Sequence, residues 1–324
     1  MKTVLIITAS FDPQADLLIA ELRRRNIPCV RWNTYEFPIS SFLTYRASDR
    51  QFDAEIISDG RTLDLATVGS IWWQWDQPAG FPAQLSPAER RFAEREAELA
   101  VNALPAIGNF AWINHPSRER LANSKPAQLA AARSAGLEIP RTIITNNPDD
   151  VRHFIATSHE QIIYKAFSPA RNIAPDKALF TGLITDESLT NLELIRVTPG
   201  IFQERIDKAY ELRITVVGTR IFAVKIESQV LAETRLDWRH AQHDVAYEAV
   251  TLPDQVATKI RTFMESIGLV YGAFDFIVTP DDRYVFLEVN PSGAYMWVET
   301  ATGLAITSAI ADALIEPCIP QRAQ

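Results

Sequence analysis

Two acidic residues and an amide lie on adjacent apolar segments near the end of the chain. The stretch GAFDFIVTPDDRYVFLEVNPSG contains two apolar runs joined by TPDDRY. A two-residue turn at Asp281 and Asp282 would join these runs as an antiparallel hairpin. Asp275 then lies directly opposite Glu288, and Asn290 follows on the same face as Glu288. The sequence therefore predicts that two carboxylates and an amide oxygen converge on one small volume.

This group of oxygen atoms has two interpretations. An acidic hairpin can simply face solvent on one side of a sheet. However, like charges directly opposite each other are destabilising unless a cation lies between them. Oxygen ligands favour a hard cation, and three protein ligands with room for phosphate oxygens are typical of Mg²⁺. We favour a Mg²⁺ site with a nucleotide, because the residues expected on the opposite face are apolar: Phe274, Phe276, Phe286 and Val289.

The composition is that of a globular chain with an acidic balance. The 324 residues are 47% hydrophobic and 22% charged, with a net charge of −8. A nucleic-acid surface normally needs a broad basic face, and the basic clusters here are short. No apolar run approaches the roughly 20 residues of a membrane span, and the start MKTVLIITAS lacks a signal-peptide pattern. With only Cys29 and Cys318, we expect a reduced, cytoplasmic protein without nucleic-acid or membrane partners.

The first half of the chain alternates between strand and helix patterns. Residues 3–8 are typical of a buried strand, and Asp12 and Pro13 open an amphipathic helix. PCVRWN follows as a second strand, which predicts a βαβ unit. A further helix is predicted over 86–104, with Ser86 as its cap.

The second half is richer in strand patterns. A helix is predicted from Ser124 to Gly136, followed by a strand at RTIIT. Strands predominate after residue 200, and a last helix is expected over about 301–315. This order predicts an α/β unit followed by α+β units that enclose a shared site.

The hairpin resembles the metal-binding hairpin of the ATP-grasp superfamily. Other segments follow the order seen in the ATP-grasp peptide maturases, the microviridin-type or graspetide synthetases: INHP, SKPAQLAAARSAGLEIPRTIITNNP, IIYKAFS, FQERIDKAYELRITVVG, DWR and FLEVNPSG…WVE. The resemblance covers nearly the whole chain. It implies an ATP-grasp fold with an N-terminal βαβ pre-ATP-grasp domain over 1–120, a central subdomain over 121–199 and a C-terminal subdomain with the metal hairpin over 200–324.

The resemblance also implies a nucleotide site with ATP and two Mg²⁺ ions. Lys125 and Lys165 would bind the α- and β-phosphates through their charge. Lys125 could instead be a surface residue at a helix start, whereas Lys165 lies in an apolar strand and should have an anionic partner. The full set of implied nucleotide-binding residues is Lys125, Lys165, Gln203, Glu204, Ile206, Glu211 and Arg213, with Glu204 and Ile206 at the adenine and Glu211 at the ribose. The implied metal ligands are Asp275, Glu288 and Asn290.

The implied catalytic residues are Arg213, Asp237 and Arg239. Arg213 shares a strand face with Glu211, from which it would reach the phosphates, although an exposed strand arginine is equally common. Asp237 and Arg239 belong to the triplet DWR, outside any clear strand. Arg239 there could hold a substrate carboxylate or an acyl phosphate. The neighbouring His240-x-x-His243-Asp244 could indicate zinc, but no third strong ligand accompanies the histidines at structural-site spacing.

The implied activity is ATP-dependent cyclisation of a ribosomal precursor peptide. A Glu or Asp side chain would be phosphorylated, and a Ser or Thr hydroxyl or a Lys amine would then form an ester or amide. Similar enzymes bind the leader part of the precursor with acidic residues on a hairpin of the central domain. The matching segment here is LITDESLTNLELI, with Asp186, Glu187 and Glu193 as candidates, although a polar turn is the simpler interpretation of each. A homodimer is also implied.

Two other functions remain open: a ligase that adds an amino acid to a protein or small acid, and a non-catalytic peptide-binding protein with a degenerate ATP site. Three departures from the family pattern bear on them. FSPARNIAPDKALFTG lacks the glycines usual in the loop that covers the phosphates. Gln74 and Trp75 stand where two arginines are common, and Ala294 and Tyr295 stand where Gln-Trp is common. None of these departures touches the metal hairpin.

Overall fold

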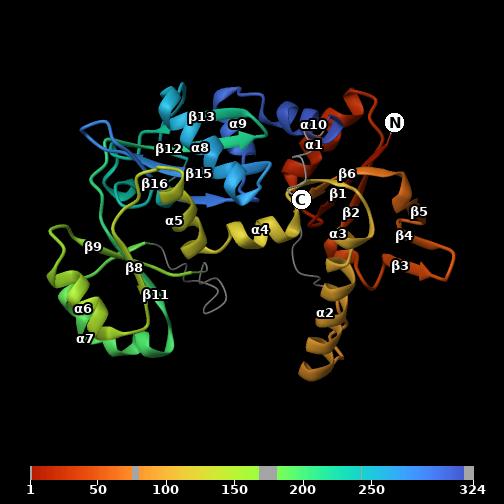
Figure 1. Ribbon diagram of the computed structural model, residues 1–324, viewed down its shortest axis with the longest axis horizontal. Coiled ribbons are helices and arrows are strands. Elements are labelled where there is room, and N and C mark those ends of the chain that lie inside the picture. Colours follow the sequence, from red (N-terminus) through yellow and green to blue (C-terminus); the bar gives the residue numbers. More distant parts are fainter. Residues whose placement is uncertain (1, 75–79, 168–180, 242, 317–324) are drawn as a thin grey trace.

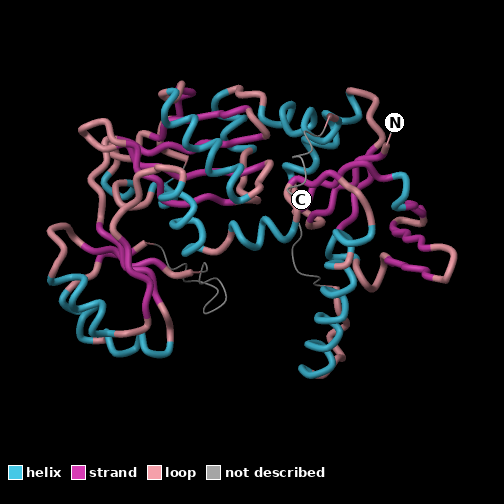
Figure 2. Tube along the Cα trace, viewed as in Figure 1, coloured by secondary structure: helices cyan, strands magenta, loops and turns pink. Residues whose placement is uncertain are grey.

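The structure is a computed structural model, and it describes residues 2–74, 80–167, 181–241 and 243–316. The strands in these ranges form four sheets, one parallel and three antiparallel. Figure 1 shows them in three parts, N-terminal, central and C-terminal, with helix α4 (Pro116–Ala122) running between the first and the last. The trace in Figure 2 shows the central part as a separate small lobe.

The N-terminal part contains a parallel sheet of order β2-β1-β6-β7. Helix α1 begins after Asp12, whose carboxylate accepts hydrogen bonds from the backbone N–H groups of Gln14 and Ala15. This confirms the predicted βαβ start. The elements are β1 (Thr3–Thr8), α1 (Pro13–Arg24), β2 (Cys29–Asn33), β6 (Val68–Trp73) and β7 (Ala111–Ile113).

One face of this parallel sheet packs against α1. The other face packs against helix α2 (Pro87–Asn102) and a small antiparallel sheet. Ser86 and Glu89 form a capping box at the start of α2, as the sequence predicted. The remaining elements here are η1 (Thr34–Glu36), β3 (Phe42–Ala47), β4 (Phe52–Ser58), β5 (Arg61–Asp64), η2 (Leu65–Thr67) and α3 (Leu104–Ile107).

The central part is an antiparallel sheet of order β10-β9-β11-β8 with a core of its own. The expected hairpin in LITDESLTNLELI is wrong: after a short β10 this segment is helical, because Thr185 and Ser188 cap a new helix start. Strand β11 starts at Gly200, so the central sheet extends past the boundary that we expected at 199. The elements are β8 (Thr142–Thr145), α6 (Pro148–Ala156), β9 (Ile162–Lys165), β10 (Gly182–Leu183), α7 (Asp186–Thr190), η4 (Leu192–Val197) and β11 (Gly200–Glu204).

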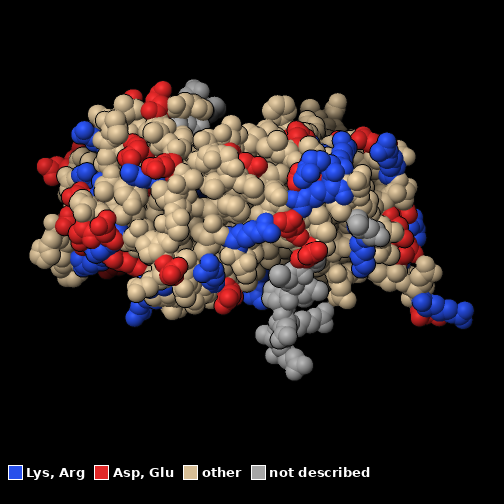
Figure 3. All heavy atoms as spheres, turned by 90° about the horizontal axis from the view of Figure 1, so that it is seen from above, with Lys and Arg blue, Asp and Glu red and all other residues tan. Residues whose placement is uncertain are grey.

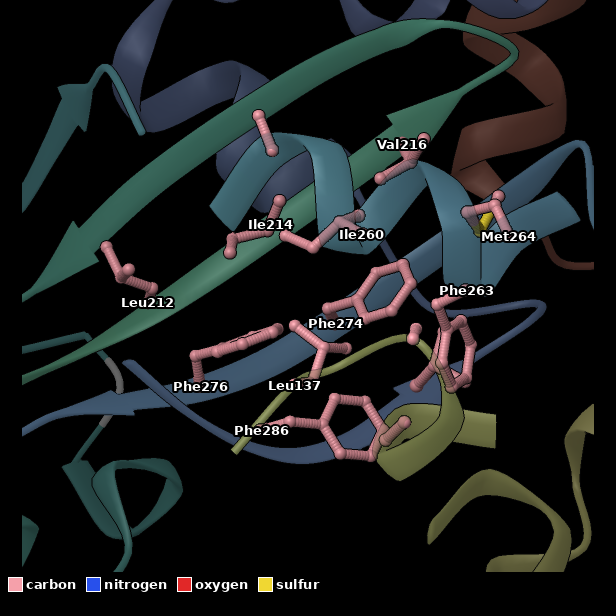
Figure 4. Packing of buried hydrophobic residues seen from close by; sticks show 14 of the residues in the cluster. Leu137, Leu212, Ile214, Val216, Ile260, Phe263, Met264, Phe274, Phe276 and Phe286 are labelled. Carbon is pink, nitrogen blue, oxygen red and sulfur yellow. The ribbon is translucent and has the colours of Figure 1, made fainter. Parts of the chain in front are cut away.

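The C-terminal part is a five-stranded antiparallel sheet of order β14-β13-β12-β15-β16. Helix α8 (Asp254–Ile267) covers one face, and Figure 4 shows Phe263 and Met264 of this helix among side chains of β12, β15 and β16. Helix α5 (Lys125–Ser134) joins the same core. The strands are β12 (Tyr210–Val217), β13 (Arg220–Ile226), β14 (Tyr247–Val250), β15 (Tyr271–Val278) and β16 (Tyr284–Asn290).

The opposite face of this sheet packs against the end of the chain and the N-terminal part. The single helix expected over 301–315 is two helices, α9 (Met296–Thr302) and α10 (Ile306–Ile315), because Gly303 adopts a φ of +71° that ends the first. Figure 1 shows α10 beside α1. Their side chains belong to one hydrophobic cluster that includes Ile6 of β1 and Tyr271 of β15. The N-terminal and C-terminal parts therefore share a core.

The surface seen in Figure 3 carries acidic and basic side chains interspersed over the same face. Within the described residues, no helix combines the length and apolar character that crossing a bilayer requires.

Asn114 joins the N-terminal and C-terminal parts through its side chain, which is 1% exposed. Its Nδ2 donates to the carbonyl oxygens of Tyr271 at 2.9 Å and Pro291 at 2.7 Å. Its Oδ1 accepts from the backbone N–H groups of Val270 and Tyr271, each at 2.9 Å. This one side chain thus satisfies four backbone groups.

We expect Asn114→Ala to lower the free energy of unfolding by about 3 kcal/mol, because buried backbone groups lose their partners. Urea denaturation followed by circular dichroism measures the change. Asn146→Ala is the matched control, because Asn146 is exposed and makes one long hydrogen bond to Arg196 at 3.3 Å. Its effect should stay within about 0.5 kcal/mol. Equal effects of the two substitutions would contradict the role of Asn114.

Candidate active site

Strands β15 and β16 place Asp275 directly opposite Glu288, which confirms the predicted pairing. Asn290 pairs with Ala273, so it is the diagonal neighbour of Asp275. The opposite face is apolar as predicted, because the buried core contains Phe274, Phe276, Phe286 and Val289.

The turn that produces this pairing differs from the prediction. The backbone N–H of Thr279 donates to the carbonyl of Arg283 at 3.0 Å, so the connection holds Pro280 as well as the two aspartates. Continued without interruption, this register would place Leu287 opposite Asp275. A one-residue shift in register brings Glu288 there instead. The longer turn shifts the strand register by one residue, and the bulge shifts it back, so Asp275 still pairs with Glu288.

Each carboxylate of the hairpin has a cationic partner from another element. Arg213 donates from Nη1 to Asp275 at 2.9 Å, and Lys125 donates to Glu288. Burial raises the pKa of Asp275, although the charge of Arg213 acts against this. Burial also opposes ionisation of Glu288, but Lys125, Lys165 and Arg239 outweigh it and lower the pKa of Glu288 to about 2. The cationic residues that we expected at the phosphates therefore lie around the hairpin that carries Asp275 and Glu288.

Lys165 lies at the end of β9 and donates to the amide oxygen of Gln203 at 2.8 Å. Gln203 in turn donates to Thr142 at 2.9 Å. We expected an anionic partner for Lys165. Its hydrogen-bond acceptor is instead the neutral Gln203 amide, although the negative charge of Glu288 also acts on it. Burial lowers the pKa of Lys165, and Glu288 opposes this effect.

The residues expected at the adenine and ribose lie at the end of β11, in the connection that follows it, and near the start of β12. Glu204 ends β11, where its backbone N–H donates to the carbonyl of Arg141 at 2.9 Å, and Ile206 is half-buried in the connection that follows. Glu211 is buried and accepts from Lys208 at 2.7 Å. Burial raises the pKa of Glu211, and Lys208 opposes this effect.

Asp237 and Arg239 lie in a loop that contains the short helices η5 (Ala232–Thr234) and η6 (Trp238–Ala241). Asp237 is 4% exposed and accepts from Nε of Arg239 at 2.8 Å and from its Nη2 at 2.5 Å. These hydrogen bonds raise the pKa of Arg239, which therefore stays a cation. In the described part of the chain, no group of three or more His, Cys, Asp or Glu side chains is arranged to hold a metal, so the zinc interpretation gains no support; the side chain of His240 lies outside that part.

Four of the predicted site residues, Arg213, Arg239, Asp275 and Asn290, line a cavity of about 450 Å³. Gly293 permits the close packing of its wall, because a Cβ there would lie 2.8 Å from Nη2 of Arg213 and 2.7 Å from Cβ of Ala273. The residues that line the cavity are Asn123, Arg213, Trp238, Arg239, Asp275, Asn290, Pro291, Ser292, Gly293, Ala294 and Trp297. Sequence reasoning missed Asn123, Trp238 and Trp297 as site residues. For the two tryptophans, their places within DWR and after NPSG were the available signal.

Gln128 of α5 holds the outer edge of β16 and was also missed. Its Nε2 donates to the carbonyl of Val289 at 2.8 Å, and its Oε1 accepts from the backbone N–H of the same residue at 3.0 Å. Val289 lies between Glu288 and Asn290, so this contact fixes the strand that carries two of the three expected metal ligands.

The three acidic residues expected to meet a leader peptide are not among those that line the cavity. Asp186 and Glu187 occupy the first turn of α7. Glu193 accepts from Arg152 and Arg196, each at 2.7 Å.

Two of the three departures from the family pattern lie partly outside the described residues, namely Trp75 and residues 168–180. Gln74 is half-buried after β6, and its backbone N–H donates to Ile7 at 2.8 Å. Ala294 lines the cavity. Tyr295 instead packs against α1, where its backbone N–H donates to the side chain of Gln14 at 2.6 Å.

Comparisons with known proteins agree over the whole chain. The family model described as the MvdD pre-ATP grasp domain matches residues 3–120. The macrocyclase MdnC from Microcystis aeruginosa MRC, solved with the precursor peptide MdnA, is 33% identical with a TM-score of 0.88, over 97% of this chain and 99% of that chain. The macrocyclase MdnB from the same source is 29% identical with a TM-score of 0.82, over 98% and 100%.

A RiPP-associated ATP-grasp ligase from Chryseobacterium gregarium, solved with ADP and a leader and core peptide, is 27% identical with a TM-score of 0.88, over 97% of each chain. A search of curated proteins found no match. The fold is therefore the ATP-grasp fold with an N-terminal pre-ATP-grasp domain, as the sequence predicted. The chain belongs to the microviridin-type ATP-grasp macrocyclases, a family of ligases.

Proposed function

We propose that this protein is an ATP-dependent cyclase that activates Glu or Asp side chains of a ribosomal precursor peptide and links them to Ser or Thr hydroxyls, or to Lys amines. The observation that carries the proposal is that Asp275, Arg213 and Arg239 line one cavity, while Glu288 lies opposite Asp275 on the hairpin and contacts Lys125. A carboxylate is a poor electrophile at neutral pH, and its phosphorylation concentrates negative charge. Preorganised cations and oxygen ligands are what such a step requires.

The donor set at the hairpin fits Mg²⁺. Asp275, Glu288 and Asn290 offer oxygen atoms, which hard cations prefer. Two facing carboxylates require positive charge between or beside them, and Arg213 and Lys125 supply it in this structure. Asp275, Glu288 and Asn290 would hold two Mg²⁺ ions, whose positive charge would offset the negative charge of the ATP phosphates. A structure of the ligase PsnB contains Mg and ADP.

The remaining nucleotide contacts follow from position. In this structure Lys125 contacts Glu288 and Lys165 contacts Gln203. Both lysines would move to the phosphates of ATP. For Lys165 the reason is that a phosphate carries more negative charge than the neutral Gln203 amide. Glu204, Ile206 and Gln203 would surround the adenine at the end of β11, and Glu211 would accept from the ribose hydroxyls. In this structure Lys208 neutralises the negative charge of Glu211.

The substrate carboxylate would lie beside Arg239. Asp237 uses Nε and Nη2 of the guanidinium, which fixes its plane at the cavity wall. Arg213, which also lines the cavity, is held by Asp275 and by the carbonyl of Ala294 at 3.2 Å. Both arginines would neutralise the acyl phosphate, and the Trp238 ring would limit access of water.

We propose that the leader part of the precursor binds the central part near α7. Asp186 and Glu187 supply negative charge in the first turn of this helix. Leu194 and Val197, which follow it, are 67% and 83% exposed. An extended peptide with a basic residue and apolar neighbours would complement this surface.

The test uses the protein with ATP, Mg²⁺ and the precursor peptide encoded beside its gene. We expect products lighter than the precursor by whole numbers of water molecules, measured by mass spectrometry. A gain of one residue mass would indicate the amino-acid ligase instead. No mass change and no peptide-dependent ADP formation, with an authenticated precursor, would contradict the proposal and favour a binding protein. The expected homodimer stays a prediction, for sedimentation to measure.

A further inference from the structure

Glu119 on α4 is a half-buried acid, with one buried carboxylate oxygen, that the proposed chemistry does not yet use. Its Oε2 atom is buried and has no hydrogen-bond partner among the described residues. Buried polar atoms without a partner are rare in native structures, and each calls for an explanation. By contrast, the buried acids Glu211 and Asp275 each have a cationic partner.

Glu119 lies directly behind the cavity wall. Asn123, one helical turn further on the same face of this segment, lines the cavity. So does Ser292, whose side chain neighbours the Glu119 carboxylate and favours its charged form, although it makes no hydrogen bond to Oε2. Ser292 therefore stands between the buried carboxylate and the cavity.

The charged groups near Glu119 are directed elsewhere. Arg118 lies against the end of α8 at Gly268, Arg120 is exposed, and Lys125 is paired with Glu288. Burial raises the pKa of Glu119 to about 7, and Ser292 alone opposes this effect. A carboxylate with this pKa can take up a proton at neutral pH.

The second half of the proposed reaction needs a proton acceptor. A hydroxyl or amine that attacks an acyl phosphate must lose a proton as the new bond forms. Among the described residues that line the cavity, Asp275 is the one acid, and it is held by Arg213 and assigned to the metal. The arginines there are cations and cannot accept a proton.

We propose that Ser292 and Glu119 form a proton relay for the attacking group of the peptide, an inference that rests on the proposed function. The hydroxyl oxygen or amine nitrogen bonds to the acyl carbon, while its proton passes to Oγ of Ser292. The Ser292 proton passes to Glu119 at the same time. The bond between the acyl carbon and the phosphate oxygen breaks, and its electron pair leaves with the phosphate. The proton on Glu119 then passes to the departing phosphate, which leaves the ester or amide and HPO₄²⁻.

Glu119→Gln tests the relay, because the amide keeps the size of the side chain but accepts no proton. We expect ADP formation with the precursor to stay within about threefold of the parent protein, and links formed per ADP to fall at least about 10-fold. Added hydroxylamine attacks acyl phosphates without help from a base. Hydroxamate formation should therefore persist in the variant, which shows that the acyl phosphate is still made.

Ser292→Ala should reproduce the loss of links per ADP, and Ser292→Thr, which keeps the hydroxyl, should restore most of it. Arg120→Gln is the control on the same helix, because Arg120 is exposed. Unchanged links per ADP in both Glu119→Gln and Ser292→Ala would overturn the relay. An equal loss of ADP, hydroxamate and links would also overturn it, because a structural role produces that result. If Glu119→Gln does not fold, the comparison of Ser292→Ala with Ser292→Thr tests the relay instead. Failure of the parent protein to form links would instead contradict the proposed function.

Discussion

Glu288→Gln is expected to slow link formation by at least about 1,000-fold, with little effect on folding. The amide keeps the shape of the side chain but removes the negative charge around which Lys125, Lys165 and Arg239 gather. Phosphoryl transfer depends on charge neutralisation more than on any covalent role of the protein, so a lost ligand charge has a large effect. Quantitative mass spectrometry of the linked peptide at saturating ATP measures the rate.

A second readout identifies the cause of this loss. ADP should raise the melting temperature of the parent protein more in the presence of Mg²⁺ than in its absence, and Glu288→Gln should remove the difference. Glu248→Gln is the matched control, because Glu248 is an exposed glutamate on β14 of the same sheet. If Glu288→Gln kept the Mg²⁺-dependent shift and most of the rate, the assignment of the metal site would be wrong.

Replacing Arg239 should have the next largest effect. We expect Arg239→Gln to slow link formation by about 100- to 1,000-fold, because the developing charge on the acyl phosphate loses one of its two arginines. Arg239→Lys should recover only part of this loss, since a lysine cannot reproduce the planar two-point contact with Asp237. The loss should lie in the rate at saturating precursor more than in binding of the leader.

Arg235→Gln provides the comparison for Arg239, because Arg235 is exposed in the same loop. Leader affinity, measured by fluorescence anisotropy, should be the same in both variants and in the parent protein. A weaker leader contact with an unchanged rate in Arg239→Gln would place this arginine in peptide recognition and contradict its proposed role at the acyl phosphate.

The hairpin shows what the sequence could predict and what it could not. The predicted pairing of Asp275 with Glu288 is correct, although the two-residue turn from which we inferred it is wrong. The signal for the bulge was present: Phe286 and Glu288 are two residues apart, yet one had to be buried in the core and the other had to face the site. Strict alternation places such residues on one face, so an extra residue was required between them.

Contacts between distant segments were beyond sequence reasoning. The side chains of Asn114 and Gln128 bind backbone groups more than 150 positions away, and no local pattern distinguishes them from exposed amides. Helix α8 was not predicted, although Pro253 and Gly268 cap its two ends, because strand patterns precede and follow it in the sequence. By contrast, local signals sufficed at α1 and α2, where caps and prolines define the helix start.

The core shared by α1 and α10 has a consequence for anyone who recombines members of this family. Exchanging only the first hundred or so residues with a relative would place foreign side chains against Ile306 and Ile310, which are fully buried in that core. A chimaera with a swapped central lobe, which has its own core, should express well, whereas one with a swapped N-terminal lobe needs the last helix of the same donor.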